Sequence, residues 1–403
     1  MAGRKKKKRS AKSGYYDFNL VAVVILLICF GLVMLYSTSA YTAQVKFGND
    51  MNFFTKQTII SVVSILAALF LSKFDYHLLY YVSKMIYWIS IILMFMVKFT
   101  PLGVEVNGAR RWLRFGIQAL QFQPAEVAKI AAITFIPCLI MKMGREITTR
   151  RGLLKLLAYG LGLAAAAFYL TENLSTAMII AGITVIMIFI AHPNKRLFLM
   201  WGGILAVLVV LARIMLQVTL GEMTLDMDNV ENFRLARVLV WLNPEKYSSE
   251  GGYQIMQALY AIGSGGFFGK GLGNSIQKLG PVPEAQNDMI FSIICEELGV
   301  FGGMVVLLLF GYMLYRLFFI AQNAPDFYGS LMVSGILIHI ALQVILNICV
   351  VLNWIPTTGI TLPFFSYGGT SIMFLMAEMG IALSVSREIK LSLIHISEPT
   401  RRT

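Results

Sequence analysis

The chain has 403 residues, of which 57% are hydrophobic and only 14% are charged. Soluble globular domains have about a quarter of their residues charged, so this composition excludes an ordinary soluble enzyme and predicts an all-α polytopic membrane protein. The net charge of +13 is concentrated partly in RKKKKR at residues 4–9. A basic run of this kind binds nucleic acid or anionic lipid; ahead of an apolar segment we expect lipid, with residues 1–16 as a cytoplasmic tail and no nucleic-acid partner.

The cysteines and histidines indicate no metal centre. All four cysteines lie in apolar stretches, and none belongs to a CxxC pair. The four histidines are scattered, without the spacing of a ligand motif. We therefore expect neither a disulfide framework nor a tightly held metal ion.

About twenty apolar residues cross the hydrocarbon core of a bilayer, and ten segments approach that length. They are 18–38, 57–73, 79–99, 123–142, 153–170, 174–191, 198–217, 289–311, 329–352 and 367–386. With the N-terminus inside, the positive-inside rule places 142–155, 192–196 and the loop carrying Arg316 in the cytoplasm, together with the C-terminus. Residues 17–390 then form one transmembrane domain. Residues 391–403 have no periodicity, and we expect them to be disordered or non-native.

The external loop 100–118 carries Arg110 and Arg111 against the positive-inside rule, so we expect these side chains to bind an anionic group. The helix that follows begins near Glu126 and Lys129. These two residues are three apart and lie on one helix face, so they are expected to pair. The pattern leaves open whether the pair is structural or catalytic and favours the structural interpretation.

The largest connection, residues 218–288, is also external and precedes the eighth span. Long loops in compact domains are usually functional. Within it, residues 234–244 predict a short interfacial helix that presents Arg234 and Arg237 on one face.

The same connection contains a glycine-rich run around Lys270. It does not fit the P-loop pattern, because Ser264 stands where the first glycine belongs. We expect a turn that lets the backbone approach a ligand closely, and direct contact with a diphosphate stays open.

Carboxylates surround the start of the eighth span. Asp288 directly precedes it, and Glu296 and Glu297 lie within it. Charges in a membrane are costly, so they indicate a functional site. Asp288 fits a helix N-cap and a catalytic carboxylate equally well, whereas one of the two glutamates is expected to serve a structural hydrogen bond. The Pro/Gly-rich loop 353–371 predicts a re-entrant cap over the bundle, with Glu378 deeper in the last span.

Several of these motifs occur together, in order, in one known family. Over residues 15–390 the chain resembles the SEDS family of polytopic peptidoglycan glycosyltransferases, which includes FtsW, RodA and SpoVE. The resemblance is carried by NGARRW (107–112), FQPAE (122–126), GKGLGNSIQKL (269–279), PEAQNDMIF (283–291), EELG (296–299) and LPFFSYGGTS (362–371). The NSIQKL and PEA segments are more similar to the FtsW and SpoVE branch than to RodA.

The resemblance implies that the substrate is lipid II, an undecaprenyl-diphosphate-linked disaccharide pentapeptide. Lipid II would be polymerised into β-1,4-linked glycan at the outer face of the cytoplasmic membrane, at the division septum, with undecaprenyl diphosphate leaving. Asp288 matches the family's essential aspartate, and we assign it the role of general base. Glu126 and Lys129 match the family's acidic and basic pair. The substrate-binding set that we predict is Arg110, Arg111, Glu126, Lys129, Arg234, Lys270 and Glu297.

The reaction also implies a cofactor and partners. A loosely bound Mg²⁺ or Mn²⁺ ion would suit the diphosphate, since hard cations prefer oxygen ligands. The family works with a class B penicillin-binding transpeptidase, and we expect this and other divisome membrane proteins as partners.

Two motifs depart from the family pattern. Gln286-Asn287-Asp288 stands where HTD is usual, and position 173 is Asn where Asp is common, which removes a charge there.

Two other functions remain open. A lipid II flippase or other transporter would use intramembrane charges such as Lys129 and Glu378 to line a pathway. Against it, the sequence has no inverted repeat. A non-catalytic divisome scaffold is the third interpretation, and the retention of Asp288 argues against it.

Overall fold

The computed structural model of the chain describes residues 15–106, 109–114, 121–220, 233–247, 252–280 and 282–389. Within these ranges the side chains of residues 106, 220, 233 and 234 are not described. The basic run at 4–9 and the predicted tail at 391–403 lie outside the described residues.

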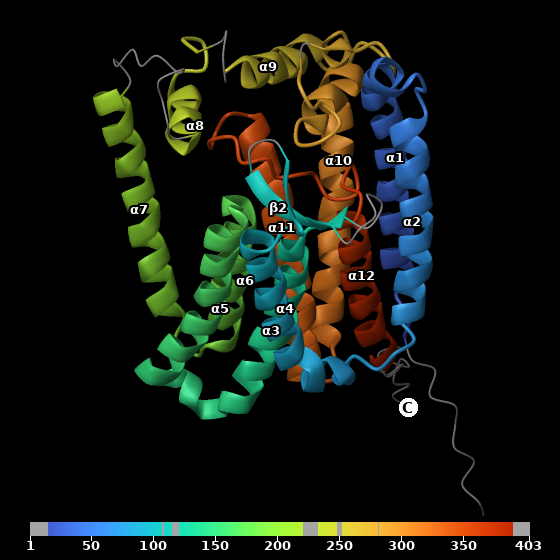
Figure 1. Cartoon of the computed structure of the whole chain (residues 1–403). Coiled ribbons are helices and arrows are strands. Elements are labelled where there is room, and N and C mark those ends of the chain that lie inside the picture. The colour runs from blue at the N-terminus through green and yellow to red at the C-terminus, as the bar shows by residue number, and fades with distance from the viewer. Residues whose placement is uncertain are drawn as a thin grey trace, which may run out of the picture.

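Ten long helices in the described ranges form the bundle (Figure 1). They are α1 (Phe18–Phe47), α2 (Asn52–Leu71), α3 (His77–Phe99), α4 (Pro124–Met143), α5 (Arg150–Thr171), α6 (Leu174–Ala191), α7 (Lys195–Leu220), α10 (Ile290–Asn323), α11 (Phe327–Val351) and α12 (Ser371–Glu388). Each predicted span overlaps one of them. Nine are apolar and long enough to cross a membrane, whereas α12 has suitable length but carries three charged residues. The prediction of a polytopic helical membrane protein is confirmed.

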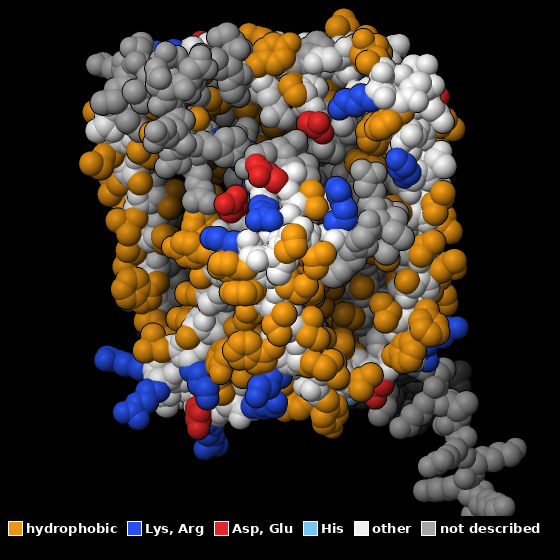
Figure 2. Space-filling view, in the orientation of Figure 1, with side chains coloured by type: hydrophobic (Ala, Val, Ile, Leu, Met, Phe, Trp, Pro, Cys, Tyr) orange, Lys and Arg blue, Asp and Glu red, His pale blue; other side chains and the backbone are white. Residues whose placement is uncertain are grey.

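The two ends of the described chain lie together. The N–H of Tyr15 donates to the carbonyl of Ile389 at 3.2 Å. The short helices α8 (Phe233–Leu242) and α9 (Tyr253–Gly265) lie at the opposite end of the bundle (Figure 1). Figure 2 shows hydrophobic side chains over the middle of one face, with Lys and Arg at the end where the described chain begins and ends and further Lys and Arg in the opposite half. The basic residues at the end with the termini fit the positive-inside rule.

The predicted external loop 100–118 is partly sheet, which the all-α prediction missed. Strands β1 (Gly103–Val106), β2 (Ala109–Arg114) and β3 (Gln121–Phe122) form an antiparallel sheet in the order β1-β2-β3. Along β2, Ala109 and Leu113 are buried while the residues between them are partly exposed. Such short strands give too few residues for a period-two pattern to be recognised in sequence.

The prediction that Arg316 lies in a cytoplasmic loop is wrong, because α10 continues through it to Asn323. The Arg316 guanidinium forms an ion pair with Asp17 at 2.7 Å, and the Asp17 side chain is fully buried. Asp17 also caps α1, since its Oδ1 accepts the N–H of Leu20 at 2.9 Å. The positive-inside rule indicates which membrane face a basic residue lies near. It does not show that Arg316 belongs to a helix and pairs with a carboxylate far away in the sequence.

Replacing Arg316 by Leu leaves the buried Asp17 carboxylate without its cation. We expect the free energy of unfolding to fall by about 3 kcal/mol, the order found when one partner of a buried ion pair is removed. Thermal unfolding of the purified protein in detergent measures this. The double variant Arg316→Leu/Asp17→Asn should recover part of the loss, because no uncompensated charge remains; a double variant less stable than the single one would contradict this account.

Candidate active site

Asp288 lies in a turn that directly precedes α10, and neighbouring segments hold this turn in place. From α9, Gln254 Nε2 donates to the carbonyl of Pro283 at 3.1 Å. From the segment before α12, the N–H of Tyr367 donates to the carbonyl of Gln286 at 2.9 Å. Because main-chain atoms are held on both sides, the position of Asp288 depends on contacts from distant parts of the chain.

A third contact reaches Asp288 itself. Asn347 of α11 is fully buried, and its Nδ2 donates to the carbonyl of Asp288 and to the carbonyl of Ile360, both at 2.8 Å. One amide therefore joins α11, the Asp288 turn and the segment that follows α11.

The interpretation of Asp288 as a helix N-cap is wrong. Met289 occupies the N-cap position of α10 and makes no side-chain capping bond. Asp288 is thus outside the helix, and its carboxylate is free of the role that most often explains an aspartate at such a position.

The environment of Asp288 makes its carboxyl group a weaker acid than usual. Its pKa is raised to about 6, first by burial and also by the charge of Glu284, while its own backbone N–H and Arg237 act in the opposite direction. The residue as a whole is half-buried. A desolvated carboxylate in a half-buried residue can accept a proton from a bound substrate near neutral pH.

One arginine, Arg237, lies close enough to this carboxylate for their charges to interact, and Arg111 lies close to Arg237. Arg237 of α8 donates to the carbonyl of Thr357 at 3.1 Å, and Arg111 of β2 donates to the carbonyl of Glu172 at 3.3 Å. The pKa of Arg237 is lowered first by burial and then by the charge of Arg111, whereas Asp288 raises it. Arginine side chains grouped in this way near a carboxylate suit an anionic ligand such as a diphosphate.

Arg237 was not in the predicted binding set, although its spacing of three from Arg234 was visible. The side chain of Arg234 itself is not described. Arg110 has a different environment from Arg111, since its guanidinium donates to the carbonyls of Lys98, Thr100 and Gly103 at 3.2–3.3 Å. These bonds join the end of α3 to the hairpin, so Arg110 supports the position of its neighbour.

The glycine-rich run packs against a break in α10. At Gly299 the backbone leaves the helical conformation, with φ 69° and ψ −172°. The carbonyls of Glu296 and Glu297 accept the N–H groups of Lys270 and Gly271 at 3.0 and 2.9 Å. Two further backbone bonds run from Val300 and Phe301 to Gly266 and Phe267 at 3.0 and 3.1 Å. The glycines thus allow one backbone to approach another, where the sequence had indicated approach to a ligand.

Glu296 and Glu297 are both fully buried, and each has its own lysine. Lys270 reaches Glu296 and Lys278 reaches Glu297, both at 2.7 Å. Glu296 also accepts the hydroxyl of Ser275, and Glu297 accepts the hydroxyl of Ser37 at 2.8 Å. Both glutamates therefore brace the loop against α10, where the sequence predicted this role for one. Substrate binding by Lys270 and Glu297 stays a prediction.

Glu126 and Lys129 pair as predicted. They lie in the first turns of α4, their charged atoms are 2.9 Å apart, and both are almost fully buried. This geometry is that of a structural ion pair, and contact with substrate stays a prediction for both residues.

The segment 353–371 packs into the bundle, as the re-entrant interpretation expected. Phe365 is buried and makes edge contacts with Phe30 of α1 and tilted contacts with Phe310 of α10. Ser366 Oγ accepts the N–H of Leu362 at 2.8 Å, closing the turn from within. This segment therefore fixes the surroundings of Asp288 through α1 and α10 together.

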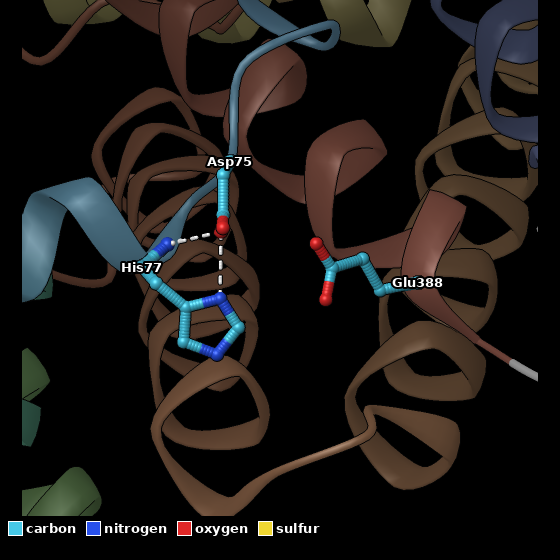
Figure 3. Close-up of side chains that lie close together, drawn as sticks. All are labelled: Asp75, His77 and Glu388. Atoms are coloured by element: carbon cyan, nitrogen blue, oxygen red, sulfur yellow. Dashed lines mark hydrogen bonds and ion pairs between the residues drawn. The ribbon is translucent and has the colours of Figure 1, made fainter.

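In the described part of the chain, one group of three side chains has the composition of a metal site: Asp75, His77 and Glu388 (Figure 3). It lies at the end of the bundle opposite to α8 and α9, beside the last turn of α12. Both ring nitrogens of His77 already face carboxylates, Nδ1 that of Asp75 at 2.6 Å and Nε2 that of Asp326 at 3.0 Å. The group is remote from Asp288 and contributes nothing to its chemistry.

Gly269→Ala tests the packing of the glycine run. The added Cβ would clash with the carbonyl of Glu297, and φ is +79°. Gly273→Ala is a matched control, because φ is +85° there but nothing lies within 4 Å. Backbone strain costs roughly 1–2 kcal/mol in both variants, so we expect Gly269→Ala to lower the unfolding temperature clearly more. Equal unfolding temperatures would show that the loop does not need this close approach.

Comparison with known proteins agrees with the motifs. A family model described as "Cell cycle protein", FTSW_RODA_SPOVE, matches residues 17–391. The stage V sporulation protein E of Bacillus subtilis is 38% identical over 375 residues, covering 92% of this chain and 97% of that protein. A probable peptidoglycan glycosyltransferase FtsW of Trichlorobacter lovleyi is 33% identical, covering 94% of each chain.

Solved structures agree with the fold. A chain from a peptidoglycan synthase complex that coordinates polymerisation and crosslinking superposes with a TM-score of 0.72, at 27% identity, covering 93% of this chain and 98% of that one. The rod shape determining protein RodA of Thermus thermophilus gives a TM-score of 0.65 at 26% identity, covering 94% and 98%. On these matches, the chain belongs to the FtsW, RodA and SpoVE family, is similar in sequence to FtsW and SpoVE, and is a peptidoglycan glycosyltransferase.

Proposed function

We propose that this glycosyltransferase polymerises lipid II into β-1,4-linked glycan during cell division, with Asp288 as general base and undecaprenyl diphosphate as leaving group. One observation carries the assignment. The carboxylate of Asp288, whose pKa is raised to about 6, lies near Arg237, which in turn lies near Arg111, and Asp288 is outside the helix that it precedes. This combination provides a base for a hydroxyl group and positive charge for a diphosphate.

The proton transfer follows from the properties of Asp288. A sugar hydroxyl is a poor nucleophile, and a carboxylate within hydrogen-bond reach removes its proton as it attacks. The 4-hydroxyl oxygen of the acceptor forms the new bond to C1 of the donor, and the bond from C1 to the diphosphate breaks. The proton passes to Asp288, and C1 inverts from the α-diphosphate to the β-glycoside.

Arg237 and Arg111 are placed to stabilise the leaving diphosphate, whose negative charge grows as the bond to C1 breaks. The arginine fork can bind phosphate oxygens bidentately, and burial strengthens the attraction. Substrate binding by Arg234, whose side chain is not described, stays a prediction beside that of Arg237. Arg110 supports the hairpin that carries Arg111.

A divalent cation, Mg²⁺ or Mn²⁺, fits this site if the substrate supplies most of its ligands. Glu284, whose charge acts on Asp288, would be its protein ligand, and Asp288 stays free to act as the base. One carboxylate together with phosphate oxygens of the substrate is a usual provision for Mg²⁺. The ion would neutralise charge on the leaving group.

The cellular setting is part of the proposal. The chain is a multi-pass membrane protein, and we place both termini in the cytoplasm and Asp288 on the outer side, at the division septum. The basic end of the bundle in Figure 2 supports this orientation. Likeness to a chain of a synthase complex that couples polymerisation to crosslinking supports a class B penicillin-binding transpeptidase as partner, with other divisome membrane proteins.

Asp288→Asn should abolish polymerisation, because the amide cannot accept the proton. We expect a loss of at least about 100-fold. Glycan synthesis from purified lipid II, by protein reconstituted with its transpeptidase in the presence of Mn²⁺, measures it. The wild-type rate should rise with pH through about 6, since the carboxyl group is protonated and inactive below that value. Polymer from a well-folded Asp288→Asn protein would remove Asp288 from the mechanism.

Arg237→Leu should slow the reaction by about 100-fold, because the leaving group loses a cation. It should also move the acid limb of the pH profile upward, since Arg237 lowers the pKa of Asp288. The control is Arg213→Leu. Arg213 lies on α7, and its guanidinium packs 5.0 Å from the ring centre of Trp241, which is on α8 with Arg237. An acid limb that stays in place in Arg237→Leu would place Arg237 too far from Asp288 to act on it.

A further inference from the structure

One face of α11 is polar although it lies inside the bundle. His339, Gln343 and Asn347 are spaced by four residues, so they follow one another along the same face. All three are buried, with 5% exposure or less. Polar side chains are rarely buried in a membrane protein without a purpose, which makes this face a second feature that needs an explanation.

All three side chains join α11 to neighbouring segments. His339 Nδ1 lies 2.8 Å from a carboxylate oxygen of Glu378 on α12. Gln343 Nε2 donates to the carbonyl of Thr361 at 3.1 Å. Asn347 alone of the three reaches the turn before α10.

Asn347 uses both hydrogens of its amide in this contact. One goes to the carbonyl of Asp288 and the other to the carbonyl of Ile360. Among the described residues, Asn347 is the one whose side chain donates to the carbonyl of Asp288. Removing the amide would leave two carbonyls without this donor in a buried place, which costs more than the loss of an ordinary exposed hydrogen bond.

We propose that Asn347 is a positioning residue for catalysis: its amide fixes the main chain of Asp288 against the re-entrant segment, so that the carboxylate stays aimed at the substrate. The inference rests on the proposed role of Asp288 as general base. Asn347 itself touches neither substrate nor reacting atoms. It acts by holding the turn, and general-base catalysis is sensitive to displacements of about 1 Å.

The effect on protonation has a definite sign. The charged groups that act on Asp288 are Arg237 from α8 and Glu284 from the turn, with Arg111 of β2 acting on Arg237. On α11 the nearest titratable residue along the polar face is His339, two steps of four residues away. Burial is the largest influence, so a loosened turn that admits water should lower the pKa of Asp288 from about 6 toward its ordinary value of 3.8.

The test compares two near-isosteric variants on the same helix face. Asn347→Leu removes the contact with Asp288, and Gln343→Leu removes a contact with the same re-entrant segment that does not touch Asp288. Both proteins are reconstituted with the transpeptidase, and kcat and KM for lipid II are measured from about pH 4 to 8, with thermal unfolding alongside. We expect Asn347→Leu to lower kcat at least about tenfold with little change in KM and to move the acid limb to lower pH.

If Asn347 had a structural role alone, both variants would unfold at lower temperature and have a lower kcat at every pH, with both acid limbs in the wild-type position. That result would overturn the inference. A shifted limb in Gln343→Leu would also overturn it. If Asn347→Leu is too slow to profile, Asn347→Gln decides, because it retains the donor: recovery of activity above the leucine variant supports positioning, and equal rates contradict it. Full activity of Asp288→Asn would instead overturn the proposed function, which separates the two failures.

Discussion

The break in α10 at Gly299 is the constraint on which the rest of the site depends. A backbone that leaves the helix inside a membrane exposes N–H and C=O groups that lipid cannot satisfy. The segment after α9 satisfies four of them with its own main chain, which requires glycine where the two backbones meet. The first half of α10, with Asp288 just before it, is thereby anchored to the segment that follows α9 as well as to the bundle.

This constraint divides the charged residues into two groups. Glu296, Glu297 and Lys278 are buried, and together with the partly exposed Lys270 they hold the loop on α10, so that losing either member of a pair would lower stability. Arg237, in contrast, lies near the half-buried Asp288 and near Arg111. The first group supports the fold, and the second is the one that we propose for an anionic substrate.

Sequence reasoning predicted the spans and the pairing of Glu126 with Lys129, because length and helical spacing are local signals. It could not predict that Lys270 pairs with a buried glutamate, since the two residues are 26 positions apart in separate segments. It also left Arg237 out of the predicted binding set. Which face of a short interfacial helix turns inward is decided by tertiary contacts such as that of Arg237 with Thr357.

The rigidity of the turn that carries Asp288 and the acidity of its carboxyl group depend on each other. A general base works best when its pKa lies near the pH of the reaction, and burial supplies this for Asp288. Burial without fixation would let the turn relax toward water and return the carboxyl group to ordinary acidity. The main chain of Asp288 is instead held through its carbonyl by Asn347, while the carboxylate is left without a capping role. Holding the backbone and freeing the side chain allows one residue to be both desolvated and reactive.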